Sequence, residues 1–243
     1  MSAPASAAGE PGAAARPGPG RRGGRENLAR ILQALFGAAV LLELGAQLAG
    51  RETGHLIAKP LLMSLLAAYA ATRGAPRLLV AALLCGWGGD VFLMAGADWA
   101  FLVGMGLFAA GHVCYLALFG RGRTSPALGL AYGAFLVAAM GLLWTDLPAG
   151  LRIPVGVYSL LLTAMAYRSS ALGRTAGVGG ALFLVSDMIL ATGIAEWPQL
   201  PASDFWIMLT YVGAQYLLVT GALGAFGCAS APDRAYREAR TAV

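Results

Sequence analysis

The chain has 243 residues, of which 58% are hydrophobic and 12% are charged, and its mean hydropathy is +0.68. This composition is too apolar for an ordinary soluble domain and predicts an integral membrane protein. The formal net charge is +5, but the arginines flank apolar segments, which favours an anionic lipid surface over nucleic acid as the partner.

The chain begins with a polar segment and continues with eight apolar ones. Residues 1–27 are rich in Ala, Gly, Pro and Arg and contain no residue able to seed a hydrophobic core, so we expect a disordered tail. Each apolar segment that follows has about the 20 residues that cross a bilayer as a helix. These segments are 28–50, 56–72, 77–95, 99–119, 126–145, 151–168, 176–195 and 204–226.

The connections between these segments are short and contain Gly, Pro and charged residues, so consecutive helices should be antiparallel. The sequence therefore predicts an all-α fold, a compact bundle of eight transmembrane helices in one domain (28–226). A C-terminal tail follows over 227–243.

Lysine and arginine are distributed unequally over the two sides of this bundle. Fourteen lie in the N-terminal segment, the second, fourth and sixth connections and the C-terminal tail, whereas Arg51, Lys59 and Arg152 lie on the other side. Because positively charged segments remain in the cytoplasm, both termini are predicted to be cytoplasmic. That orientation requires an even number of spans.

Five ionisable side chains interrupt the predicted spans: Glu43, Lys59, Asp90, His112 and Asp187. Such groups cost free energy in lipid, so we expect them to face the bundle interior and to mark a functional site. From the rise of about 1.5 Å per residue, the three carboxyls fall at middle to exoplasmic depth. Lys59 enters from the exoplasmic end and His112 lies in the cytoplasmic half. Depth thus allows the carboxyls and the amine to meet.

Two carboxyls in a low-dielectric pocket favour different protonation states, so that one donates a proton while the other stays anionic. This arrangement suits acid-catalysed hydrolysis through a cationic intermediate. Structural roles are the alternative: Asp90 and Asp187 could pair with Lys59 or with backbone donors, and Glu43 could pair with Lys59. A neutral His112 bonded to a carbonyl is equally compatible with the sequence.

Other catalytic classes find less support. A zinc hydrolase needs about three ligands such as His or Cys, and the chain has two histidines and no Gly-x-Ser-x-Gly motif. Residues 87–90, Trp-Gly-Gly-Asp, do not match the Gly-x-Gly-Asp motif of intramembrane aspartyl proteases. A transporter or channel remains an alternative, because midplane charges and a faint similarity between the Asp90 and Asp187 segments fit one.

Several motifs, in chain order, resemble the YhhN-like lysoplasmalogenase family of eight-pass membrane proteins. They are Lys59-Pro60-Leu-Leu, Gly89-Asp90-Val-Phe-Leu, Gly111-His112 with Tyr115, Gly180-Ala-Leu-Phe with Ser186-Asp187, and Tyr211 with Gln215. The resemblance covers residues 28–226. It implies hydrolysis of the vinyl ether bond of lysoplasmalogens to a fatty aldehyde and glycerophosphoethanolamine or glycerophosphocholine. It also implies an endoplasmic reticulum membrane and no metal or organic cofactor.

On this resemblance, Asp90 or Asp187 protonates the vinyl ether, and the other carboxylate stabilises the cation and positions water. Lys59 attracts the substrate phosphate. The remaining substrate-binding candidates are His112, Tyr115, Tyr211, Gln215 and Glu43. The expected partners are a lysophospholipid and the bilayer, and a homodimer is compatible with the sequence.

Overall fold

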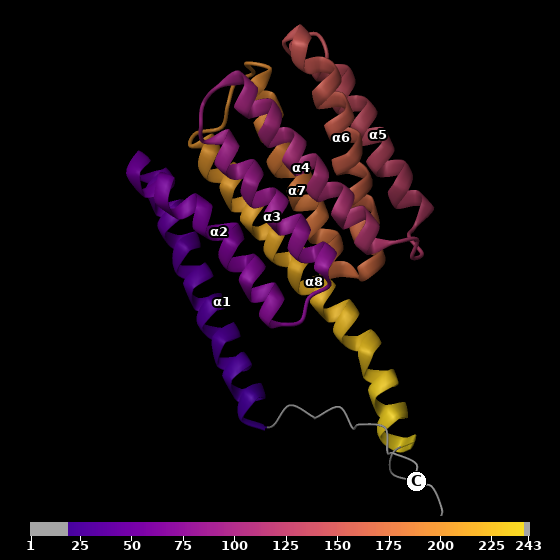
Figure 1. Cartoon of the computed structure of the whole chain (residues 1–243). Coiled ribbons are helices and arrows are strands. Elements are labelled where there is room, and N and C mark those ends of the chain that lie inside the picture. Colours follow the sequence, from indigo (N-terminus) through magenta and orange to yellow (C-terminus); the bar gives the residue numbers. More distant parts are fainter. Residues whose placement is uncertain (1–18, 241–243) are drawn as a thin grey trace, which may run out of the picture.

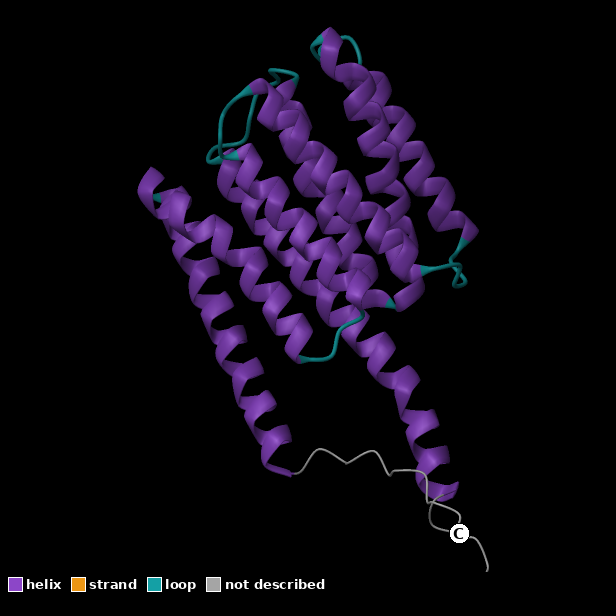
Figure 2. Ribbon diagram, viewed as in Figure 1, coloured by secondary structure: helices purple, strands orange, loops and turns teal. Residues whose placement is uncertain are grey.

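The computed structural model describes residues 19–240, without the side chains of 19–22, 52–53 and 228–240. Over this range it contains eight α-helices, one 3-10 turn (Ser170–Leu172) and no strand (Figure 2). The helices are α1 (Pro19–Leu48), α2 (Glu52–Thr72), α3 (Arg77–Leu93), α4 (Asp98–Phe119), α5 (Pro126–Leu143), α6 (Ala149–Ser169), α7 (Arg174–Ile194) and α8 (Ser203–Arg240). The predicted all-α fold is confirmed.

Seven of the helices are long and apolar enough to cross a membrane. The other, α3, has 17 residues, which places it at the lower end of the usual range of about 17–25. Helices α2 to α7 begin and end within a few residues of the predicted segments. At the end of α4, Gly120 has a φ of 60°, a left-handed conformation that favours glycine and stops the helix.

The helical region extends beyond the predicted domain at both ends. Helix α1 begins at Pro19, so residues 19–27, which we expected to be disordered, are helical. Proline is favourable at the first position of a helix, and a helix already nucleated by an apolar span extends at low cost. Residues 1–18 lie outside the described part of the chain. Helix α8 continues as one helix to Arg240 and projects from the bundle (Figure 1).

Consecutive helices run antiparallel, as their short connections predict. The α1–α2, α3–α4, α5–α6 and α7–α8 connections gather at one end of the bundle, which we call the connection end, and both described termini lie at the other end (Figure 1). Packing is most extensive between α1 and α2, α3 and α4, and α7 and α8. Helix α5 lies at the edge of the bundle, mainly against α6 (Figure 1).

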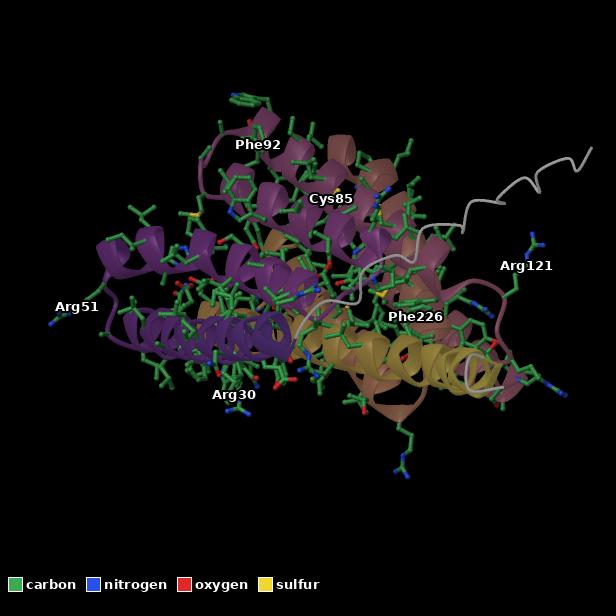
Figure 3. All side chains as sticks on the ribbon, turned by 60° about the horizontal axis from the view of Figure 1, so that its bottom comes forward. Arg30, Arg51, Cys85, Phe92, Arg121 and Phe226 are labelled. Atoms are coloured by element: carbon green, nitrogen blue, oxygen red, sulfur yellow. The ribbon has the colours of Figure 1, made fainter. Side chains whose placement is uncertain are left out.

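The core and the outer surface both fit a bundle in lipid. A single large cluster of buried apolar side chains joins α2, α3, α4, α7 and α8, with Leu62, Leu83 and Leu218 fully buried. The outer faces carry many exposed apolar side chains, such as Val137 on α5. The labelled arginines Arg30, Arg51 and Arg121 point outward from the helices (Figure 3). Charge is therefore placed at the rim and the apolar surface faces outward.

Candidate active site

One largely apolar cavity lies in the half of the bundle next to the connection end. It has a volume of about 140 Å³. Its wall is mostly aliphatic and aromatic. The polar side chains on the wall are those of Lys59, Asp90, Tyr158, Ser159, Thr163, Ser186, Asp187 and Tyr211.

Four of the eight predicted site residues meet at this cavity: Lys59 on α2, Asp90 on α3, Asp187 on α7 and Tyr211 on α8. Asp90 is 3% exposed. It interacts electrostatically with Lys59, and Asp187 interacts with Asp90. Helix depth allowed three carboxyls and the amine to meet, and the fold brings Asp90, Asp187 and Lys59, but not Glu43, to this cavity.

Glycine contacts between α3 and α4 fix the position of Asp90. A Cβ atom on Gly89 would lie 2.6 Å from the ring of Phe108 and 3.1 Å from the carbonyl oxygen of Gly104. A Cβ atom on Gly104 would lie 3.0 Å from the carbonyl oxygen of Gly89. Only residues without side chains allow two membrane helices to approach this closely. These glycines therefore have a packing role.

A second pair of glycines places α7 between α6 and α8. A Cβ atom on Gly179 would lie 2.9 Å from the Ala214 carbonyl oxygen of α8, and one on Gly180 would lie 2.8 Å from Ala166 Cα of α6. Asp187 follows Gly180 by seven residues, about two helical turns, and so lies on the same side of α7. Close packing thus brings both carboxyls inward from α3 and α7.

Each aspartate accepts a hydrogen bond from a tyrosine of another helix. Tyr211 Oη donates to Asp90 Oδ2 at 2.9 Å, and Tyr158 Oη donates to Asp187 Oδ2. Among the described residues, neither Oδ1 atom has a hydrogen-bond partner, and neither is sealed from the cavity. One oxygen of each carboxyl is therefore held by the protein, and the other is available to a ligand.

Tyr158 is a site residue that the sequence analysis missed. It lies in an apolar helix where an isolated tyrosine is as typical of a lipid-facing or core position as of a site. His112 Nε2 lies 3.2 Å from its hydroxyl. Since Tyr158 donates its one proton to Asp187, His112 must donate from Nε2, which assigns this tautomer. His112 contacts the site through Tyr158 and does not line the cavity.

Tyr115 and Gln215 also lie behind the cavity wall. Tyr115 Oη donates to Gln215 Oε1 at 2.6 Å, and the Gln215 side chain hydrogen-bonds Tyr211. A buried chain of hydrogen bonds therefore runs from Tyr115 through Gln215 and Tyr211 to Asp90. The two outer residues orient Tyr211 and do not line the cavity.

Glu43, a predicted substrate-binding residue, does not line the cavity, and the alternative of a pair with Lys59 is not formed either. Glu43 is fully buried, its Oε1 atom lies 2.6 Å from His55 Nδ1, and Gln47 donates to the same atom at 3.1 Å. The described side chains include no ion pair between Glu43 and Lys59. The reason is that α2 begins at Glu52, earlier than predicted, so His55 is helical and packs against α1.

Thr163, a second residue that the sequence analysis missed, carries a buried hydroxyl without a partner. Its side chain is 5% exposed and lines the cavity, but Oγ1 makes no hydrogen bond within the described structure. By contrast, Thr192 and Thr220 donate to carbonyl oxygens of their own helices at 2.8 and 2.9 Å. An unpaired buried hydroxyl costs about 1–3 kcal/mol, so this group reduces the stability of the bundle.

The polar groups on the cavity wall are carboxyls and hydroxyls, together with the amine of Lys59. Among the side chains that the structure describes, no group of three or more His, Cys, Asp or Glu is placed to hold a metal ion. The arrangement can transfer protons and stabilise a cation, because two carboxyls face one apolar space and each keeps one oxygen available.

Several known proteins are similar to this chain in sequence. Lysoplasmalogenase TMEM86B of Homo sapiens is 37% identical over 150 residues, which cover 62% of this chain and 65% of that protein. A lysoplasmalogenase of Mycobacterium bovis is 32% identical over 191 residues, which cover 70% of this chain and 72% of that protein. The chain thus spans slightly less than two thirds of the human relative. No solved structure gives a significant match.

The sequence model of the YhhN family matches residues 54–222, which include nearly all of α2, the whole of α3 to α7, about half of α8 and every polar residue on the cavity wall. The chain therefore belongs to the YhhN family.

Proposed function

We propose that this protein is a lysoplasmalogenase, a membrane hydrolase that cleaves the vinyl ether bond of lysoplasmalogens. The observation that carries the proposal is the pair of aspartates, Asp90 and Asp187, which face one apolar cavity with one oxygen each held by a tyrosine. Relatives that bear the name lysoplasmalogenase in mammals and mycobacteria support the same conclusion.

The reaction needs a proton donor, an anion and one water molecule. One aspartic acid transfers its proton to the β carbon of the vinyl ether, which leaves an oxocarbenium ion at the carbon bonded to oxygen. The other carboxylate stabilises this cation and accepts a proton from the attacking water. The resulting hemiacetal collapses to a fatty aldehyde and the glycerol hydroxyl of glycerophosphoethanolamine or glycerophosphocholine. Every atom comes from the lipid and the water.

The cavity suits an amphipathic substrate. Lys59 supplies a positive charge on a wall that also carries Asp90, and we assign it to the phosphate of the lysophospholipid. The rest of the lining is mostly apolar and suits the alkenyl chain. All lining residues come from a single chain, so the proposal needs no second copy.

The protein is a multi-pass membrane protein, and we propose an endoplasmic reticulum location with cytoplasmic termini. The excess of lysine and arginine at the end of the bundle that holds the described termini supports this orientation.

The test is aldehyde release by purified protein in detergent, with lysoplasmenylethanolamine as substrate. The saturated alkyl ether lysolipid is the critical comparison, because it has the same shape but no double bond to protonate. Asp90→Asn and Asp187→Asn should each reduce turnover at least about 100-fold, whereas Asp204→Asn, an exposed carboxyl in the first turn of α8, should leave it unchanged. Full activity in both site variants would refute the mechanism. Absence of product from every lipid, with the protein folded, would favour transport.

A further inference from the structure

The gap between α4 and α5 is an unusual feature of the bundle. These two helices follow each other in the chain, yet α5 packs mainly against α6 and makes at most marginal contact with α4. In Figure 1, α5 stands at the outer edge of the bundle. Its span is also the least buried of the candidate membrane helices. The space between α4 and α5 is therefore not filled by packing of the two helices against each other.

Both helices nevertheless contribute to the wall of the active-site cavity. The contributing residues of α5 are Phe135, Leu136, Ala139, Met140 and Leu143, and those of α4 are Phe101, Met105 and Phe108. Their spacings of three or four residues place each set on one face of its helix. The two faces are apolar and carry no charge. Because both line one space without packing together, the cavity reaches the bundle surface between them.

Contacts at the connection end cover part of the cavity. Trp197 Nε1 donates to Asp146 Oδ2 at 2.7 Å, which joins the α5–α6 connection to the segment after α7. A small cluster of buried apolar side chains lies beneath this contact, formed by Leu143, Leu147, Val155 and Ala195. These contacts obstruct a route from the aqueous side between α5, α6 and α7.

Polar contacts also bound the opposite end of the gap. Thr124, in the α4–α5 connection, donates to the Tyr167 hydroxyl of α6 at 2.6 Å. Arg168 of α6 donates to the carbonyl oxygen of Gly120 and to Thr124. Polar contacts thus bound the gap at both ends, and the apolar cavity faces of α4 and α5 lie between them, in the half of the bundle next to the connection end.

We propose that the slot between α4 and α5 is the lateral opening through which the hydrocarbon chain of a lysolipid passes from the bilayer and in which that chain stays during turnover. This inference rests on the proposed function for the identity of the lipid. The occupant follows from the lining: the slot is uncharged and apolar, whereas Lys59 and the two aspartates lie on walls built by α2, α3 and α7. The chain therefore lies toward α4 and α5, and the phosphate lies toward Lys59.

Ala139 is the position that tests this inference most directly. It lies on the cavity face of α5 between Phe135 and Met140, so a larger side chain there should shorten the space for the chain. Burial of one methylene group contributes a factor of about four to binding. Displacement of two methylene groups should therefore reduce kcat/KM for a long-chain substrate more than about tenfold.

The experiment compares lysoplasmenylethanolamines with alkenyl chains of about eight and about eighteen carbons, whose extra methylenes supply the binding energy. Ala139→Phe should lose activity on the long chain and retain it on the short chain. Val137→Phe is the matched control, because Val137 lies on the same helix, is 73% exposed and is absent from the cavity wall. Equal losses on both chains, or the same chain-length dependence in Val137→Phe, would overturn the inference.

A second measurement does not depend on turnover. A lysophosphatidylethanolamine with a photoreactive diazirine at the end of its chain should label cavity-facing residues of α4 and α5, and an unlabelled lysolipid should compete. Labelling confined to other helices would refute the slot. If the wild-type protein releases no aldehyde but labelling maps to α4 and α5, the chain site stands and the proposed reaction fails.

Discussion

The substitution Tyr158→Phe removes one hydroxyl that joins Asp187 to His112. In the wild-type protein this hydroxyl donates to Asp187 Oδ2 and lies 3.2 Å from His112 Nε2. The variant keeps the ring, which contacts His112, and therefore keeps most of the packing. It leaves Asp187 without its one described donor and a buried imidazole N–H without an acceptor.

The expected magnitude follows from the charged character of the acceptor. A hydrogen bond to a charged group contributes about 1.5–3 kcal/mol. If that contribution orients Asp187 in the transition state, kcat/KM should fall about 10- to 150-fold. Tyr216→Phe is the matched control, because Tyr216 accepts a hydrogen bond from Gln33 outside the cavity. It should retain wild-type activity.

The assay is initial-rate aldehyde release from lysoplasmenylethanolamine, with thermal unfolding in the same detergent as the measure of folding. A double-mutant cycle with Asp187→Asn measures the coupling between Tyr158 and Asp187. Once the Asp187 carboxylate is removed, the added Tyr158→Phe change should have little further effect on kcat/KM. A folded Tyr158→Phe protein with wild-type kcat/KM would refute the reasoning. A loss of the same size in both backgrounds would show that Tyr158 acts independently of Asp187.

Two further predictions concern the unpaired hydroxyl of Thr163 and the buried carboxyl of Glu43. Thr163→Val removes a buried hydroxyl with no partner, so it should raise the midpoint of thermal unfolding and leave kcat/KM close to the wild-type value. A lower unfolding midpoint in the folded valine variant would contradict this expectation. Glu43→Ala removes the partner of His55 and Gln47, so unfolding should be easier by about 1–3 kcal/mol with KM unchanged. A raised KM in that variant would return Glu43 to the substrate site.

The helices were predictable because a membrane span is a local signal. A run of about 20 apolar residues identifies a crossing wherever its neighbours lie, and glycine or proline marks the connections. The helix ends that were missed are those where local composition conflicts with a neighbouring apolar span. Residues 19–27 are polar and rich in glycine, yet they form the first turns of α1.

The sequence predicted the depth of the site residues in the bundle but not the helix face on which each residue lies. Rise per residue gives the level of Asp90, Asp187 and Lys59 in the bundle, and the structure brings all three to one cavity. A helix that is apolar on all sides, however, does not reveal which face points inward. That is why Glu43 was placed with Lys59 although it faces His55. Tyr158 was missed for the same reason.

Fold and proposed chemistry depend on the same close helix contacts, and Gly89→Ala separates the two. The added methyl group would lie 2.6 Å from the Phe108 ring and 3.1 Å from the Gly104 carbonyl oxygen, so α3 and α4 must move apart next to Asp90. A misplacement of about 1 Å at a catalytic group can reduce the rate about 100-fold. Gly106→Ala is the control, because its Cβ atom meets nothing within 4 Å.

Aldehyde release by Gly89→Ala should therefore fall at temperatures where the protein is still folded, and Gly106→Ala should behave as wild type. Thermal unfolding and turnover, measured in the same detergent, give the comparison. If activity and the unfolding midpoint decrease in parallel, the glycine contact only stabilises the bundle. A loss of activity without loss of folding would instead assign to the α3–α4 contact the positioning of the Asp90 carboxyl.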